Sequence, residues 1–259
     1  MSIKILAIGD VCAQCGLDIL RKRLWNLRRE YNADMCIVNG ENAAGIGVTP
    51  SQARDIFEYG ADVITLGNHT YSRREIADFL DDNEYIIRPA NYGSKAPGQG
   101  YTIFEAMCGK VCVMNLSGQV NMKTGLESPF TTADNILKKL PDDIKCIVVD
   151  MHAEATSEKY ALGYYLDGRV SALFGTHTHV QTADERIFEN GTGYITDIGM
   201  TGAVNSVIGM TKESSIQFFM GDPIVRLEGA GGTAMINGIF LEIDNKTGKC
   251  IKIERINIR

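Results

Sequence analysis

Short apolar runs alternate with longer amphipathic segments along this chain, and this alternation most constrains the fold. Residues 3–8, 35–38 and 63–66 have the length and composition of buried strands. Segment 18–31 instead places apolar residues at helical spacing, at Leu20, Leu24, Leu27 and Tyr31. Repeated strand–loop–helix units predict an α/β fold.

The same patterns predict the remaining elements. Beyond the three runs above, we expect strands at 111–116, 144–149, 170–174, 236–243 and 250–258. We expect helices at 18–31, 51–59, 73–80, 132–140 and 157–166. Residues 91–99 form a Gly/Pro loop, but no repeat, low-complexity tract or linker divides the chain. We therefore expect a single domain over residues 1–259.

Composition narrows the class of protein. Hydrophobic residues make up 44% of the chain, enough for a sizeable core. The net charge of -6 argues against a general binder of nucleic acids or anionic membranes, although it leaves a small phosphate ester open as a substrate. No run approaches the roughly 18 apolar residues of a membrane span. The first residues also lack a signal-peptide pattern, so we expect a cytoplasmic protein.

The seven cysteines are odd in number, and several lie in apolar runs. Cys36 and Cys146 are examples, which favours buried thiols in a reducing compartment over a disulfide framework. Cys12 and Cys15 form a Cys-x-x-Cys motif. We favour packing in a tight turn for this pair, and a thiolate ligand or a redox pair is the alternative.

All four histidines fall in three short motifs: His69 in Gly-Asn-His, His152 in Asp-Met-His, and His177 and His179 in Gly-Thr-His-Thr-His. Imidazole is the commonest metal ligand and also a proton donor near neutral pH. Two upstream motifs, Gly-Asp at 9–10 and Asn-Gly-Glu-Asn at 39–42, add carboxylates and amides. All five motifs follow predicted buried strands. Side chains from such strand ends gather in one place in α/β proteins.

The ligand types are those of a two-metal site. Asp10, Glu41, Asn42 and Asn68 could supply oxygen ligands, although each alone is equally typical of a turn or a cap. A lone His152 would more often be a core residue. Together with the histidines, the set is typical of a dinuclear hydrolase, in which the two oxygens of Glu41 could bridge the metals. His69 directly follows Asn68, a position that suits a general acid.

The chain resembles the YmdB-like group of the calcineurin-like metallophosphoesterases. The resemblance rests on the five motifs and on the sequences at 37–44, 63–70 and 149–159, with further agreement at 182–187 and 194–202. It covers the chain from about residue 3 to near its C-terminus. It implies a four-layer α/β/β/α sandwich with two mixed β-sheets.

The resemblance also implies the site. One metal would be held by Asp10, Glu41, Asn42 and His179. The other would be held by Glu41, Asn68, His152 and His177. Glu41 would bridge the two, His69 would be the proton donor, and the metals would be iron or manganese. The implied activity is hydrolysis of 2′,3′-cyclic nucleotides to 3′-nucleotides.

The mechanism expected from these residues is attack by a metal-bridging hydroxide, while His69 protonates the departing ribose oxygen. A 3′,5′-cyclic phosphodiesterase or a phosphomonoesterase could use the same site. A weakly catalytic nucleotide- or metal-sensing regulator is a second class, against which the presence of His69 counts. A cysteine redox protein would leave the metal motifs unexplained. We expect a small phosphodiester substrate, no stable nucleic-acid or membrane partner, and a homo-oligomer.

Two positions depart from the broader pattern. The superfamily usually has Asp-x-His where this chain has Asp10-Val11-Cys12. The YmdB-like group lacks that histidine too, and Asn42 is expected to compensate. The group usually has Gly-Arg where this chain has Gly16-Leu17, so we expect no phosphate contact from residue 17.

Overall fold

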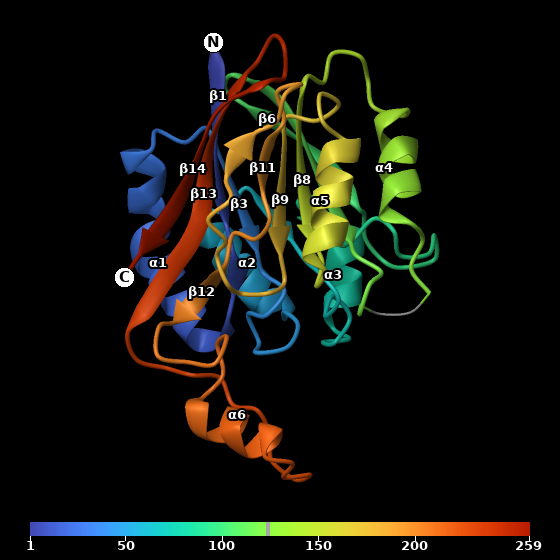
Figure 1. Cartoon of the computed structure of the whole chain (residues 1–259). Helices are drawn as coiled ribbons and strands as arrows, with labels where there is room; N and C mark the ends of the chain where they lie inside the picture. Colours follow the sequence, from blue (N-terminus) through green and yellow to red (C-terminus); the bar gives the residue numbers. More distant parts are fainter. Residues whose placement is uncertain (123–124) are drawn as a thin grey trace.

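Two β-sheets face each other at the centre of the computed structural model, and helices cover their outer faces (Figure 1). The structure describes residues 1–122 and 125–259. Parallel and antiparallel neighbours occur in both sheets. This arrangement confirms the expected α/β/β/α sandwich with two mixed sheets.

The first sheet joins the N-terminal strands to the C-terminal hairpin. Its order is β2 (Asp10–Val11), β12 (Met200–Ala203), β13 (Ala234–Asp244), β1 (Ser2–Ile8), β3 (Met35–Asn39), β4 (Val63–Thr65) and β5 (Ile86–Ile87), with β14 (Cys250–Ile258) paired to β13. Strands β1, β3, β4 and β5 run parallel, whereas β13 is antiparallel to β1 and β14. The carboxyl ends of β3 and β4 therefore lie at one edge.

The second sheet is built from the middle of the chain. Its order is β10 (Arg186–Ile187), β11 (Gly193–Ile195), β9 (Ala172–Thr176), β8 (Cys146–His152), β7 (Gly109–Ser117) and β6 (Tyr101–Ala106). Strands β7, β8, β9 and β11 are parallel, and β6 and β10 are antiparallel to their neighbours. The parallel pairing places the ends of β8 and β9 together.

Three apolar layers hold the sandwich together. Ile5, Ile37, Val148 and Phe174 belong to the layer between the sheets, and each is fully buried or nearly so. The outer layers lie under α1 (Ala13–Glu30), α2 (Pro50–Glu58) and α3 (Ile76–Asp82) on one side, and under α4 (Pro129–Leu137) and α5 (Thr156–Tyr165) on the other. Each fully buried large apolar side chain contributes about 1.5–3 kcal/mol of transfer free energy. Within the described residues, no helix combines the length and apolarity that a membrane crossing needs.

Several element boundaries differ from those expected. Helix α1 begins at Ala13, five residues before the expected residue 18, because Gly16 packs closely against the backbone of Thr201 and Leu17 is buried in the core. Strand β8 extends through His152 instead of ending at residue 149. The sequence pattern also gave no sign of β6 or of α6 (Lys212–Phe219).

A substitution at Gly175 tests how closely β9 packs against its neighbours. A Cβ atom on this residue would lie 1.8 Å from the backbone oxygen of Thr196 and 2.8 Å from Lys159 Cδ. We expect Gly175→Ala to lower the free energy of unfolding by about 1–3 kcal/mol, since overpacking a rigid backbone contact destabilises. Urea denaturation measures this difference. Gly93→Ala is the matched control, because a Cβ there meets no atom within 4 Å. Equal midpoints for both variants would contradict this account of the packing.

Candidate metal centre

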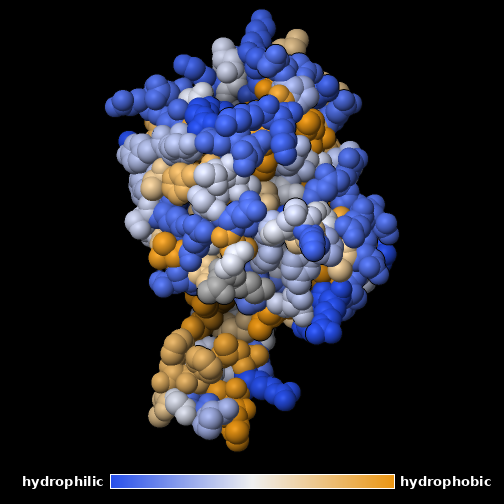
Figure 2. All heavy atoms as spheres, turned by 90° about the vertical axis from the view of Figure 1, so that its right-hand side faces the viewer, coloured by the Kyte–Doolittle hydropathy of each residue, from blue (hydrophilic) through white to orange (hydrophobic). Residues whose placement is uncertain are grey.

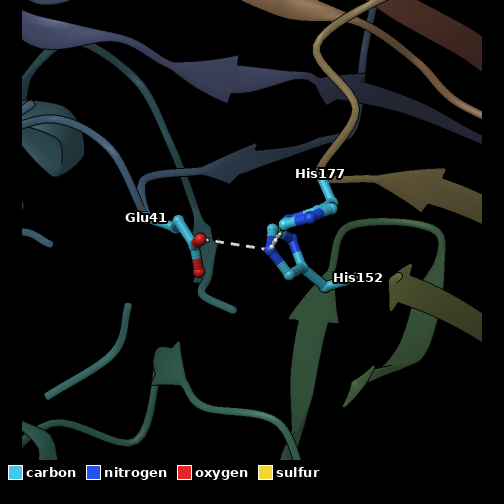
Figure 3. A group of neighbouring side chains, drawn as sticks. All are labelled: Glu41, His152 and His177. Carbon is cyan, nitrogen blue, oxygen red and sulfur yellow. Dashed lines mark hydrogen bonds and ion pairs between the residues drawn. The ribbon is translucent and has the colours of Figure 1, made fainter. Parts of the chain in front are cut away.

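The predicted site residues come together from both sheets. Asp10 begins β2, Glu41 and Asn42 follow β3, and Asn68 and His69 follow β4. From the second sheet, His152 ends β8, while His177 and His179 follow β9. Figure 3 shows the side chains of Glu41, His152 and His177 pointing toward one another. One ligand atom from each of these three residues lies within 4.8 Å of the others.

His152 Nε2 is the centre of this first cluster. It lies 2.9 Å from Asn68 Oδ1, 3.1 Å from Glu41 Oε1 and 3.1 Å from His177 Nδ1. His152 and Glu41 are completely buried. The four atoms are all capable of binding a cation.

The hydrogen bonds of His152 fix which of its nitrogens carries the proton. Its Nδ1 lies 2.8 Å from Thr176 Oγ1, and that hydroxyl donates to Asp150 Oδ1 at 2.7 Å. The Thr176 proton is thus engaged, so Nδ1 donates and Nε2 presents a lone pair. Glu41 Oε1 and Asn68 Oδ1 also present lone pairs, and Glu41 Oε1 has no hydrogen-bond donor among the described residues. Lone pairs that face one another in this way repel one another unless a cation occupies the space between the atoms.

Asp150 anchors this arrangement from beneath. Its Oδ2 accepts hydrogen bonds from Thr65 Oγ1 at 2.5 Å and from Asn39 Nδ2 at 3.1 Å. Burial raises the pKa of Asp150 to about 7, although its three hydrogen bonds act in the opposite direction. Sequence reasoning gave Asp150, Thr65 and Thr176 no role. The one available signal was a carboxylate at the end of an apolar strand run.

Burial also favours the neutral form of two histidines. It lowers the pKa of His152 to about 4, and together with the neighbouring His152 it lowers that of His177 to about 4. His177 Nε2 lies 3.1 Å from Glu154 Oε2, a contact that turns Nδ1 toward His152. A neutral imidazole held by a carboxylate at its other nitrogen is the usual state of a metal-binding histidine.

The second cluster contains Asp10, Asn42 and His179. His179 Nδ1 donates to the backbone oxygen of Ile208 at 2.8 Å, which leaves Nε2 facing the cluster. That atom lies 3.7 Å from Asp10 Oδ1 and 3.2 Å from Asn42 Nδ2. The amide nitrogen of Asn42 faces His179, so ligation through Oδ1 would require the amide to rotate. The backbone N–H of His177 donates to Asp10 Oδ2 at 3.2 Å and links the two clusters.

The electrostatics of the second cluster favour positive charge. Burial raises the pKa values of Asp10 and Glu41, and the nearby histidines oppose that rise. Burial lowers the pKa of His179, but Cys12 and Asp10 outweigh this effect and raise it to about 10. Asp10 Oδ1 has no hydrogen-bond donor among the described residues. The donor set of nitrogens, carboxylates and amides fits divalent cations, and a cation bound by Nε2 of His179 would displace the proton that Cys12 and Asp10 stabilise on this ring.

His69 lies at the same cavity as the two clusters. Its backbone N–H donates to Glu41 Oε2 at 3.2 Å. Its side chain lines a cavity of about 420 Å³ together with Glu154, His177 and His179. This position is open to a substrate, and the role of His69 as the acid stays a prediction.

A buried ion pair supports the loop that carries two of the histidines. Lys159 Nζ lies 2.8 Å from Asp197 Oδ2 and donates to the backbone oxygen of Thr176 at 2.8 Å. Asp197 Oδ2 also accepts from the N–H and hydroxyl of Thr178, at 3.1 and 2.8 Å. These bonds hold His177 and His179 at φ values of 101° and 65°, which cost non-glycine residues about 1–3 kcal/mol each. Sequence reasoning assigned Lys159 and Asp197 no role.

The two unusual positions of the sequence have different surroundings. Cys12 is buried, and its Sγ lies 3.5 Å from His179 Nδ1. Cys15 Sγ is directed instead at the backbone oxygen of Gly232, 3.8 Å away. All seven cysteines are free thiols, and Cys36 and Cys146 are buried, as their positions in apolar runs predicted. Leu17 lies on the buried face of α1 and packs in the core, where it cannot reach a substrate.

Comparisons with known proteins agree along nearly the whole chain. Residues 6–256 match the family described as YmdB-like protein. The 2′,3′-cyclic-nucleotide 2′-phosphodiesterase of Bacillus subtilis (strain 168) is 44% identical over 99% of this chain and 97% of its own length. The crystal structure of a phosphatase from Mycoplasma pneumoniae superposes with a TM-score of 0.93 at 37% identity, covering 100% of this chain and 94% of that one. The crystal structure of a hypothetical protein from Thermus thermophilus gives a TM-score of 0.91 at 36% identity and 98% coverage of both chains.

A substitution at Thr176 tests whether holding the His152 proton on Nδ1 prepares the site for a metal ion. Thr176→Val removes the acceptor for His152 Nδ1 and one donor to Asp150. We expect the affinity for Mn²⁺ to fall about 10–100-fold, the usual effect of losing a partner behind a ligand. Isothermal titration calorimetry on chelator-stripped protein measures it.

The matched control is Thr192→Val. Thr192 is equally buried, and its hydroxyl donates to Val170 in a part of the fold away from the site. We expect this variant to lose comparable stability and to retain wild-type Mn²⁺ affinity. Equal affinity losses in both variants would contradict a specific role for Thr176.

Proposed function

The chain belongs to the YmdB-like protein family, and from this premise we propose that it is a metal-dependent phosphodiesterase that hydrolyses 2′,3′-cyclic nucleotides to 3′-nucleotides. The observation that carries the proposal is the convergence of buried acceptors on His152 Nε2. The name of the Bacillus subtilis relative supports the class of substrate.

We assign two metal ions to the two clusters. Asp10, Asn42 and His179 would hold one ion, Asn68, His152 and His177 would hold the other, and Glu41 would contribute to both. When bound, two iron or manganese ions would acidify the attacking water and neutralise charge on the phosphate. The buried, preoriented side chains of the protein would lose little entropy on binding them.

The cavity supplies a wall for the nucleoside. Its lining includes four apolar side chains, those of Ile46, Ile208, Met210 and Leu227. Sites for small molecules commonly combine such apolar walls with a few polar groups that fix orientation. The phosphate would face the two clusters, and the base and sugar would lie against the apolar side chains.

His69 would supply the proton to the departing ribose oxygen. Its backbone is held by Glu41, so the side chain stands beside the metal ligands. Protonation of an alkoxide leaving group by a positioned acid contributes typically 10²–10⁴-fold to rate. The same assistance is worth little for a leaving group that departs as a stable anion.

His69→Ala tests this role. We expect the kcat for 2′,3′-cyclic nucleotides to fall by about 10²–10⁴-fold, with a smaller loss on bis(p-nitrophenyl) phosphate, whose phenolate needs less protonation. Steady-state kinetics and elemental analysis of the same samples measure turnover and metal content together. His152→Ala is the comparison, because it should lower metal content itself. Full turnover of cyclic nucleotides by His69→Ala would refute the acid role.

A substrate panel tests the proposed activity. The protein is stripped of metal and reconstituted without oxygen with Fe(II), Mn(II) or Zn(II). Each form is then assayed on 2′,3′-cyclic, 3′,5′-cyclic and monoester nucleotides. We expect the fastest turnover on the 2′,3′-cyclic substrates, with 3′-nucleotides as products. Absence of hydrolysis of every diester with every metal would overturn the proposal.

A further inference from the structure

A second cavity, which we call the adjoining cavity, meets the candidate metal centre at His179. Its volume is about 380 Å³, and His179 and Ile208 line both this cavity and the one that contains the two clusters. Ile208 belongs to the segment between β12 and β13, which projects below the body of the molecule in Figure 1. Figure 2 shows that this projection is largely hydrophobic. A substrate held at the metal centre would pass Ile208 to enter the adjoining cavity.

Strand β14 brings basic and amide side chains to the adjoining cavity. Arg255, Asn257 and Arg259 all line it, because side chains two residues apart point to the same face of a strand. Ile256 and Ile258 alternate with them and pack instead in the core on the α1 side. Since β13 is antiparallel to both β1 and β14, β14 ends at the same edge of the sheet as β3 and β4. These donors therefore lie at the edge that carries the metal centre.

Asn237 adds a buried amide to the lining. It is 3% exposed and lies opposite Asn257, whose Nδ2 donates to Asn237 Oδ1 at 2.7 Å. The Nδ2 of Asn237 has the sulfur of Met235 as its partner at 3.9 Å, and a thioether is a weak acceptor. The backbone oxygen of Asn237 accepts from the N–H of Gly9, the residue before Asp10. A buried amide with so weak an acceptor favours a further acceptor in the cavity.

The charges around the adjoining cavity favour an anion. Arg255 and Arg259 line it, and no acidic side chain among the described residues does. The Nε atom of Arg255 lies 2.7 Å from Glu185 Oε1, a contact that orients the guanidinium. A guanidinium has five N–H donors, and even a forked contact with a carboxylate occupies two of them, so at least three remain. The planar fork of arginine matches the geometry of phosphate oxygens.

We propose that the adjoining cavity binds a phosphate on the 5′ oxygen of the nucleoside whose 2′,3′-cyclic phosphate occupies the metal centre. This inference rests on the proposed function and narrows its class of substrate. Such a phosphate is present at the 3′ end of an oligoribonucleotide and in a free 5′-phosphorylated cyclic nucleotide.

The apolar part of the lining favours the RNA end. Val180, which is 61% exposed, Val204 and Met235 line the same cavity and offer a surface for the nucleoside beyond the phosphate. Contact with one phosphate gives weak binding that salt opposes. This weak contact suits a chain whose net charge is -6, because it needs no extended basic face.

Steady-state kinetics of the full-length, metal-loaded protein test the subsite with three substrates. They are adenosine 2′,3′-cyclic phosphate, the same nucleotide with a 5′ phosphate, and the dinucleotide adenylyl-adenosine that ends in a 2′,3′-cyclic phosphate. We expect the two substrates with a 5′ phosphate to have kcat/KM values about 10–100-fold higher, mainly through KM, as hydrogen bonds to a charged group provide. Arg255→Gln should abolish this preference, and Asn257→Asp should lower it by adding negative charge.

Arg169→Gln is the matched control. Arg169 is paired with Asp134 and its side chain is 39% exposed, against 38% for Arg255, which is paired with Glu185. It precedes β9, at the end of that strand away from the two histidines. We expect this variant to keep the full preference for a 5′ phosphate.

Calorimetry separates the subsite from the activity. Adenosine 3′,5′-bisphosphate should bind the Mn²⁺-loaded protein about 10-fold or more tightly than adenosine 3′-phosphate, and Arg255→Gln should remove the difference. If this difference is found without hydrolysis of any diester, the proposed function is overturned and the phosphate site stands.

Hydrolysis at equal kcat/KM for all three substrates overturns the subsite and leaves the activity. Equal affinity for the two nucleotides, or a preference that persists in Arg255→Gln, also overturns it. A dinucleotide turned over at least as well as the 5′-phosphorylated mononucleotide assigns the phosphate to an RNA end. Discrimination against the dinucleotide assigns it to a free nucleotide, and either result supports the subsite.

Discussion

The site depends on one physical constraint, the crowding of buried lone pairs around His152 Nε2. Thr176 and Asp150 hold the proton on the far side of the ring, and Glu41 and Asn68 direct oxygens at the near side. Left without a cation, this arrangement would repel itself in an environment with little water to screen it. The fold can maintain it because every participant stands at the end of a strand in a closely packed sheet. The preference for positive charge is therefore built into the backbone.

That arrangement also explains the polar groups buried behind it. The loop of His177 and His179 adopts left-handed backbone angles, which non-glycine residues reach only at a cost. The Lys159–Asp197 pair lies under this loop and binds it through Thr176 and Thr178. A buried ion pair is weak evidence for stability in general, because desolvation offsets much of the attraction. Here its hydrogen bonds act on the geometry of the loop, and that geometry aims two imidazoles.

Sequence patterns predicted an α/β fold and the residues that meet at the strand ends, because strand periodicity and strand-end motifs are local signals. The two-sheet sandwich was expected from the family resemblance instead. The patterns failed where tertiary contacts decide. His152 was expected after a strand, yet it lies within β8, since Asp150 and His152 find polar partners that a strand pattern cannot reveal. Helix α1 begins early because Gly16 packs on Thr201, a residue far along the chain. The supporting roles of Asp197 and Glu154 were missed because carboxylates are common on surfaces and their partners are distant in sequence.

The segment between β12 and β13, which carries α6, shows a different limit of sequence reasoning. Phe218, Phe219 and Ile224 have the character of core residues, and a pattern cannot tell whether such residues face their own core or another surface. Their exposure becomes visible only once the sandwich is complete without them. This segment also contacts the candidate metal centre, since His179 donates to the backbone oxygen of Ile208. This hydrogen bond helps to set the direction in which His179 Nε2 points.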